Sequence, residues 1–207
     1  GTDAGLIWTY FLNANGSVKS SRKTTAGDGL PTQANSQLGY SLANLGDING
    51  DGITDIAVGA PEYTENGKKT GITMVLFLEE TGAVKTDTSL GENLGGFPSS
   101  LAVGVRFGSS VAGIGDVNKD GIPDIAIGAS DDGNNPTGTG ATWVLLLNTA
   151  GVVTNSVNVY NNAGGFSAGL LAADDAFGSA LAGPGDVDGD GISDVIVGTP
   201  GDDDGGT

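Results

Sequence analysis

The sequence contains no cysteine, no histidine, one methionine and only eight basic side chains among 207 residues. The lack of cysteine excludes a disulfide framework and thiol chemistry, and the lack of histidine removes the commonest general base. No serine lies in the nucleophile elbow typical of hydrolases, so we expect a protein that is not an enzyme. No apolar run approaches the ~18 residues of a membrane-spanning helix, so we expect no membrane insertion.

Acidic side chains dominate the charge of the chain. The 25 Asp and Glu residues outnumber the 8 Lys and Arg residues and give a formal net charge of −17. Such a surface repels nucleic acid, and we expect no nucleic-acid partner. The 38 glycines do not follow the Gly-x-y period of collagen and therefore indicate many tight turns.

A motif of fifteen residues occurs three times, over residues 46–60, 115–129 and 185–199. The first aspartates of the three copies, Asp47, Asp116 and Asp186, lie 69 and 70 residues apart. Other features keep the same phase, namely the upstream pairs 38–39, 107–108 and 177–178 and the apolar runs 6–12, 72–78 and 141–147. A glycine turn follows each apolar run, and a polar, β-branched stretch such as 152–159 comes next.

Each repeat therefore predicts four strands. The first runs from the upstream pair, which is Phe-Gly in two of the three repeats, to the aspartate-rich loop, and the second follows that loop. The third is the long apolar run, and the fourth follows the glycine turn. No window shows a sustained helical period. Four strands per repeat are typical of one blade of a β-propeller. We expect an all-β fold with three blade-equivalents of four antiparallel strands, in one domain over 1–207 with repeats of approximately 1–69, 70–138 and 139–207.

The aspartate-rich loops have the spacing of a calcium site. Side-chain oxygens at positions 1, 3, 5 and 9 and the carbonyl oxygen at position 7 suit Ca²⁺, and glycine at position 6 permits the sharp turn. An EF-hand is excluded because position 12 is an apolar strand residue instead of glutamate. The alternative, that these are only Asp-Gly turns, does not explain three copies in register. We predict three Ca²⁺ per chain, held by Asp47, Asn49, Asp51, Ile53 and Asp55; by Asp116, Asn118, Asp120, Ile122 and Asp124; and by Asp186, Asp188, Asp190, Ile192 and Asp194.

These motifs resemble the FG-GAP repeats of the integrin α-subunit N-terminal β-propeller and of its bacterial relatives. Phe107-Gly108 and Phe177-Gly178 match the FG element, and Gly59-Ala60-Pro61 matches the GAP element. Leu38 replaces the first phenylalanine and Ser130 replaces a proline. The resemblance implies that each calcium loop joins the first and second strands of a blade, and that the protein acts in adhesion or protein recognition.

Three blades do not close a ring, because propellers usually have four to eight. A second copy placed after residue 207 would continue the repeat at nearly the same spacing. We expect the missing strands to come from that copy, which gives a homodimer with six blades and a two-fold axis. The alternative is that the sequence is a piece of a longer tandem array.

Three functions fit these features. The first is a secreted or cell-surface module that binds a protein or glycan ligand, because extracellular calcium would fill loops of modest affinity. The second is a structural, self-assembling propeller fragment with no ligand, and the third is a non-catalytic domain of a larger surface enzyme.

We expect Trp8 and Trp143 to pack in third strands. We interpret the remaining acidic clusters, at 131–132, 174–175 and 202–204, as solvated loop charges or a further cation site.

Overall fold

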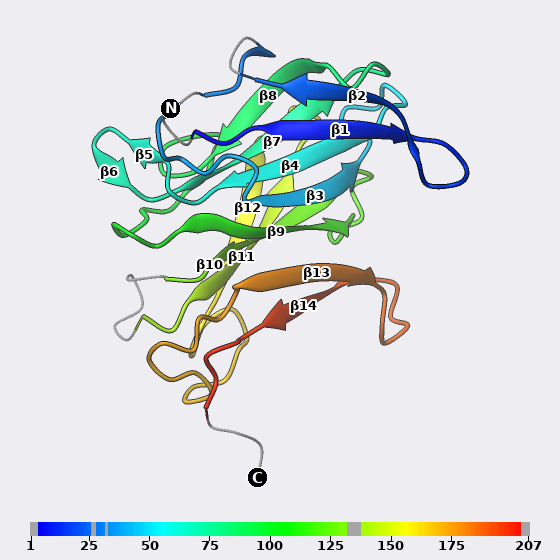
Figure 1. Cartoon of the computed structure of the whole chain (residues 1–207). Helices are drawn as coiled ribbons and strands as arrows, with labels where there is room; N and C mark the ends of the chain where they lie inside the picture. Colours follow the sequence, from blue (N-terminus) through cyan, green and yellow to red (C-terminus); the bar gives the residue numbers. More distant parts are fainter. Residues whose placement is uncertain (1–3, 26–27, 32, 132–137, 204–207) are drawn as a thin grey trace.

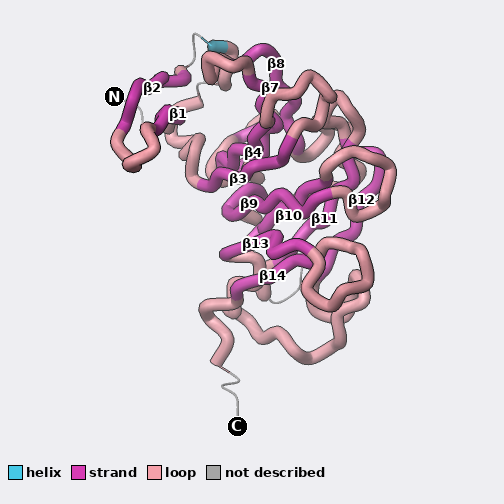
Figure 2. The backbone as a smooth tube through the Cα atoms, turned by 90° about the vertical axis from the view of Figure 1, so that its right-hand side faces the viewer, coloured by secondary structure: helices cyan, strands magenta, loops and turns pink. Residues whose placement is uncertain are grey.

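The structure, a computed structural model, describes residues 4–25, 28–31, 33–131 and 138–203. These residues form strands, turns and loops and contain no α-helix (Figure 1, Figure 2). No helix among them is long and apolar enough to cross a membrane. The strands are β1 (Ile7–Leu12), β2 (Val18–Thr24), β3 (Ser41–Gly46), β4 (Asp55–Ala60), β5 (Thr64–Glu65), β6 (Lys68–Lys69), β7 (Ile72–Leu78), β8 (Val84–Leu90), β9 (Phe107–Gly115), β10 (Asp124–Ala129), β11 (Ala141–Leu147), β12 (Val153–Val159), β13 (Ala180–Gly185) and β14 (Asp194–Gly198).

Two four-stranded antiparallel sheets form the middle of the molecule. Their strand orders are β3-β4-β7-β8 and β9-β10-β11-β12, so neighbours in sequence are also neighbours in space, apart from the small β5–β6 hairpin. Two-stranded sheets, β1-β2 and β13-β14, lie at opposite ends of the stack (Figure 1). The prediction of an all-β protein built from β-propeller blades of four antiparallel strands is confirmed.

The four sheets are in phase with one another. Gly5 bridges to Leu38 and Gly140 bridges to Phe177 in parallel, so the start of each third strand meets the start of the next blade. At the equivalent place between the two central blades, Phe107 N–H donates a hydrogen bond to the Thr70 carbonyl oxygen, at 2.9 Å. β1-β2 therefore holds the place of the third and fourth strands of a blade, and β13-β14 that of the first and second.

The strands differ from expectation at a few places. We predicted that the first strand of each repeat begins at the FG position. Only β9 does so, because Leu38 and Phe177 form single parallel bridges and the ladders of β3 and β13 begin later. The hairpin β5–β6 was not predicted, since its two-residue strands around the Asn66-Gly67 turn carry no apolar pattern.

Apolar side chains from facing blades fill the space between the sheets. Leu45 and Phe77 of one blade pack with Ile125 and Leu145 of the next in the largest buried cluster. A smaller cluster joins Ala112 and neighbouring residues of the second central blade to β13-β14. The first strands β3, β9 and β13 run side by side in both ribbon views (Figure 1, Figure 2).

Close backbone contacts also join the blades. A Cβ atom added to Gly59 would lie 2.0 Å from the carbonyl oxygen of Gly108, and one added to Gly128 would lie 2.0 Å from that of Gly178. A serine hydroxyl donates to each of these carbonyls, from Ser41 to Gly108 at 2.8 Å and from Ser110 to Gly178 at 2.6 Å. Glycine is therefore needed in the second strand because the next blade's backbone occupies the place of a side chain.

This contact predicts that Gly128→Ala destabilises the protein while Gly198→Ala does not. The two glycines hold the same place in their repeats, but a Cβ at Gly198 meets no backbone of another blade, and its nearest atom is the Ala180 Cβ at 3.2 Å. Overpacking at Gly128 should lower the free energy of unfolding by about 2–3 kcal/mol, and Gly198→Ala should change it by less than about 1 kcal/mol. Urea unfolding at low protein concentration checks this, and equal losses in the two variants would contradict it.

Candidate metal centres

Each acidic loop joins the first strand of a sheet to the second. The loops follow β3, β9 and β13 and lead directly into β4, β10 and β14, at the same end of each sheet (Figure 1). The chain must reverse here within eight residues. Aspartate, asparagine and glycine suit this local geometry because their side chains bond to nearby backbone N–H groups or permit positive φ.

The first aspartate organises each loop by accepting backbone hydrogen bonds. Asp47 Oδ1 accepts from Gly50 N–H and Asp51 N–H, at 2.8 and 3.1 Å, and its Oδ2 accepts from Gly52 N–H at 2.8 Å. Asp186 makes the same three bonds in the third loop. Asp116 accepts from the fifth and sixth residues of its loop. This carboxylate therefore lies inside the turn, with the backbone wrapped around it.

The third and fifth side chains face the same turn. Asn49 Oδ1 accepts from Asp51 N–H at 2.8 Å, and Asp51 Oδ1 accepts from Ile53 N–H at 3.0 Å. The corresponding bonds recur in the second and third loops, including those from Ile122 and Ile192 N–H. These bonds link the side chains of the third and fifth positions to the backbone of the fifth and seventh positions in all three loops.

The ninth position is different because its carboxylate is buried in the first two loops and half-buried in the third. In the second loop Asp124 is fully buried, and its Oδ2 and Oδ1 accept from Val117 N–H and Leu147 N–H, both at 3.0 Å. Asp55 bonds in the same way to the first loop and to the end of β7. Asp194, at the less covered end of the stack, accepts only from Val187 N–H, at 2.7 Å. This residue therefore ties its loop to the third strand as well as facing the site.

The surroundings shift the pKa of the ninth-position and fifth-position carboxylates in opposite directions. Burial raises the pKa of Asp55 and of Asp124 above the usual value, and the neighbouring loop carboxylates add to that rise. The pKa of Asp51 is lowered, chiefly because the Lys85 ammonium bonds to its Oδ2 at 3.0 Å. A cation inside the loops would relieve the repulsion that raises the first two values.

The ligand atoms fit a hard cation, because oxygen is the only donor type that they offer. In the third loop, oxygens of Asp186, Asp188 and Asp194 all lie within 4.8 Å of one another. No other group of three acidic side chains within the described ranges meets this distance. The fifth-position aspartate of the third loop, Asp190, is outside this group, and the three carboxylates of each of the first two loops, which have asparagine at the third position, do not lie this close together.

Backbone conformation also distinguishes the loops. The sixth residue is glycine with φ between 84° and 88° in all three, Gly52, Gly121 and Gly191. At the fourth position the first and third loops again have glycine, whereas Lys119 takes φ 63° in the second. A lysine in the left-handed region is uncommon, so the local turn imposes this conformation on it.

The sequence did not indicate that Lys85 lies beside the first loop, because 34 residues separate it from Asp51.

The other acidic clusters do not form comparable sites within the described part of the chain. Asp175 is buried and accepts from Ala172 N–H at 2.6 Å, which is a turn contact. Asp132 and Asp204 lie outside the described residues.

Comparison with known proteins identifies the repeats. The model of the FG-GAP repeat family matches residues 38–73 and 107–145, which include the first two loops. Integrin alpha-7 of Rattus norvegicus is 34% identical over 193 residues, 90% of this chain and 15% of the relative. Integrin alpha-IIb of Homo sapiens is 36% identical over 177 residues, 82% of this chain and 15% of the relative. Phosphatidylinositol-glycan-specific phospholipase D of Bos taurus is 33% identical over 173 residues, 79% of this chain and 19% of the relative. The chain thus spans less than a fifth of the length of these proteins.

The buried hydrogen bonds predict that Asp124→Asn destabilises the protein even in a calcium chelator. An amide offers one acceptor, so either Val117 N–H or Leu147 N–H would lose its partner at a cost of about 1–3 kcal/mol. The matched variant is Asp120→Asn, in the same loop but exposed, where one oxygen keeps the bond from Ile122 N–H and water can replace the bond that the other oxygen accepts from the Asn118 amide. Urea unfolding in excess chelator checks this. Equal stabilities of the two variants would show that the ninth aspartate has no structural role.

Proposed function

We propose that this chain, which belongs to the FG-GAP repeat family, is a calcium-binding β-propeller module that binds a protein or glycan ligand outside the cell. The observation that carries the proposal is the three-fold repetition of one oxygen-lined turn. The proposed ligands are the fifteen residues predicted above, and three Ca²⁺ per chain would hold them together.

Electrostatics supports calcium binding. Each loop gathers three or four carboxylates, and only the first has a lysine ammonium within bonding distance among the described residues. Like charges at this spacing destabilise the fold unless a cation compensates them. A divalent ion would therefore stabilise the junction between the first and second strands.

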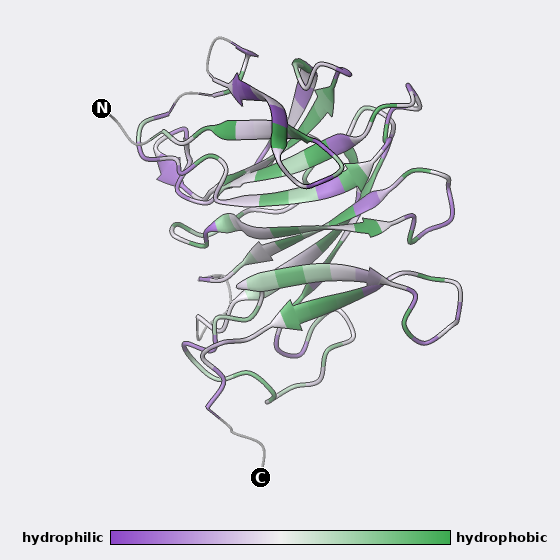
Figure 3. Ribbon diagram, turned by 45° about the vertical axis from the view of Figure 1, so that its right-hand side comes forward, coloured by the Kyte–Doolittle hydropathy of each residue, from purple (hydrophilic) through white to green (hydrophobic). Residues whose placement is uncertain are grey.

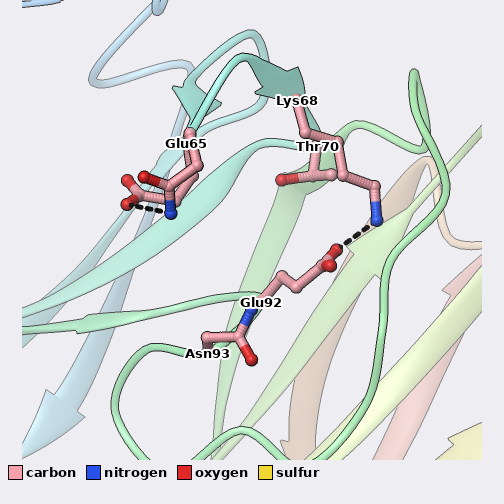
Figure 4. A pocket seen from close by; sticks show the side chains of 6 residues that line it. Glu65, Lys68, Thr70, Glu92 and Asn93 are labelled. Carbon is pink, nitrogen blue, oxygen red and sulfur yellow. Dashed lines mark hydrogen bonds and ion pairs between the residues drawn. The ribbon is translucent and has the colours of Figure 1, made fainter.

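The loops at the opposite end of the blades would form the ligand surface. Lys68 Nζ bonds to Glu92 at 2.6 Å in a polar pocket that Thr70 and Asn93 also line (Figure 4). Nearby, Glu62 pairs with both Lys69 and Arg106, and the Arg106 guanidinium lies 5.5 Å from the centre of the Tyr40 ring. Exposed aromatic and paired charged groups on loops are typical of recognition surfaces.

The relatives suggest the setting. Two of the three named above are integrin alpha subunits, and we propose an adhesion-type role at the cell surface or in the extracellular space. Calcium supply agrees with this location, because extracellular calcium is high enough to fill loops of modest affinity.

We also propose that the chain is a single domain, with the repeat boundaries given above, and that two copies complete one six-bladed ring. The sheets β1-β2 and β13-β14 each have two strands where the central blades have four. They hold complementary places, because one supplies the third and fourth strands and the other the first and second. A structural, self-assembling fragment without a ligand is the alternative in which this completion is the whole function.

A second candidate function is a non-catalytic domain of a larger surface enzyme. The relative named a phospholipase D favours it, because the matched region is under a fifth of that protein. Turnover of glycan or phospholipid substrates by this chain would contradict both functions. Binding to glycan or extracellular-protein arrays that chelator abolishes supports the binding module.

Calcium should raise the thermal stability of the chain, and chelator should reverse the rise. Each site stabilises the folded state by about 2.7 kcal/mol when free calcium is 100 times the dissociation constant. Asp190→Ala removes a ligand from the third loop and should reduce the shift in melting temperature and the calcium stoichiometry from three to two. Calorimetric titration and thermal unfolding measure both.

The control variant is Glu80→Ala, which removes the same charge from an exposed hairpin at the same end of the molecule. It should leave the stoichiometry at three. A melting curve that does not respond to chelator, or an equal effect of the two variants, would refute calcium binding at the loops.

A further inference from the structure

An aromatic cluster fastens the two complete blades to each other. Trp143 on β11, a third strand, packs edge-on against Phe97 with ring centres 4.9 Å apart, and Phe97 packs on Phe107 at 5.1 Å. Phe97 lies in the loop that leads into the second blade, and Phe107 begins β9. A tryptophan of the third strand thus fills the corner between two blades.

The same corner exists at the next blade, without its tryptophan. Phe166 and Phe177 repeat the positions of Phe97 and Phe107, and their ring centres lie 5.3 Å apart. An apolar groove of about 370 Å³ opens beside them, between β11, β12 and the outer edge of β14. Figure 3 shows β14 as a strongly hydrophobic strand at the edge of the molecule. The groove is lined by Thr142, Val144, Val159, Phe166, Phe177, Val195 and Val197.

Trp8 is the counterpart of Trp143 in the repeat, because β1 is also a third strand. Its side chain is 48% exposed, whereas that of Trp143 is 5% exposed. Tyr10 stacks beside Trp8 at 6.3 Å, and Lys23 Nζ lies 5.8 Å from the ring centre. Leu12 continues the same face and is also exposed. β1 thus presents outward the side chains that β11 buries between blades.

We infer that the groove beside Phe166 and Phe177 receives the Trp8 indole of a second copy of this chain, as β1 of that copy pairs with β14. The inference rests on the blade completion proposed above. The register follows from the two pairs of second and third strands in the chain. Val58 pairs with Met74 and Ile127 pairs with Trp143, so Val197 would pair with Trp8, and Ile196 with Thr9.

Charge complementarity favours a second copy as the occupant. β2, which would enter with β1, carries the three basic residues Lys19, Arg22 and Lys23. No lysine or arginine follows Lys119 in the sequence, so the strands and loops of the receiving end carry acidic side chains such as Asp174 and Asp203, although the Lys119 ammonium of the neighbouring blade lies near Gly191. The basic strand of one copy would therefore approach the acidic end of the other.

The contact between copies would be weaker than the contacts within the chain. Ala180 stands where Ser41 and Ser110 donate a hydroxyl to the next blade, so that bond is absent. Asn44 holds the place of Gly113 and Gly183 in the repeat. At each of these two glycines a carbonyl oxygen of the preceding blade lies 2.1 Å from the place that a Cβ would occupy, so the Cβ of Asn44 would prevent the same close approach. We therefore expect a dimer that dissociates on dilution.

Sedimentation of the full chain in calcium, over a concentration series up to millimolar protein, tests the inference. We expect a monomer–dimer equilibrium that Trp8→Ala weakens by about 30-fold or more, as for a buried aromatic anchor. Ala180→Ser restores the missing donor and should tighten the dimer about fivefold. Val103→Ala, which changes an even more exposed apolar residue in a distant loop, should leave the equilibrium unchanged.

Cysteine cross-linking tests the register, because the chain has no cysteine of its own. A mixture of Thr9→Cys and Ile196→Cys chains should form a disulfide-linked heterodimer on mild oxidation. The control mixture pairs Ile196→Cys with Ser20→Cys, which lies on the outer strand β2, and should form far less.

The outcomes separate the two proposals. A chain that binds calcium but stays monomeric at every concentration overturns both the Trp8 contact and the blade completion, and leaves the calcium sites standing. A dimer that Trp8→Ala does not weaken, or that cross-links equally through Ser20, overturns the Trp8 contact alone.

Discussion

The structure depends above all on the ninth-position carboxylates of the first two loops, Asp55 and Asp124, which are buried. Asp124 lies at the point where three strands of one blade meet, and it accepts hydrogen bonds from the loop and from the end of the third strand at once. Without these acceptors, two backbone N–H groups would be buried unpaired. The same carboxylate faces the proposed ion, so strand pairing and metal binding share a single side chain. This sharing explains why the loop and the blade repeat together along the chain.

Much of the fold follows from local sequence. The apolar runs gave the bounds of β7 and β11 directly, and the Asp-Gly loops were placed correctly between first and second strands because their signals are contiguous. The loop bonds of Asp47 could be anticipated from Asx-turn chemistry. Contacts between blades could not, because they depend on residues about 50 to 70 positions apart. Gly128 shows this: its sequence context is that of any strand glycine, and only the stacked blades reveal the carbonyl against it.

The two tryptophans also show that contacts between blades cannot be predicted from the sequence of one repeat. Both were expected to pack in third strands, which holds for Trp143 but not for Trp8 within one chain. The residues are equivalent in the repeat, and their different exposure comes only from what stands next to each strand. Lys85 is a similar case, since it approaches Asp51 because the start of β8 lies beside the first loop. The repeated sequence therefore specifies the strands and packing within each blade more fully than it specifies the contacts that each blade makes with its neighbours.

The three loops are alike in backbone but unequal in charge. The first has Lys85 bonded to its fifth-position aspartate, the second has Lys119 within its turn, and the third has an additional aspartate at position 188. Under the proposed calcium binding, a more negative cage attracts a divalent ion more strongly, and a resident ammonium must first be displaced. The sites would then load in sequence as calcium rises, beginning with the loop next to β14. This two-stranded sheet at one end of the stack would be the earliest to stiffen, so that calcium supply would act on this edge of the molecule before it affects the interior.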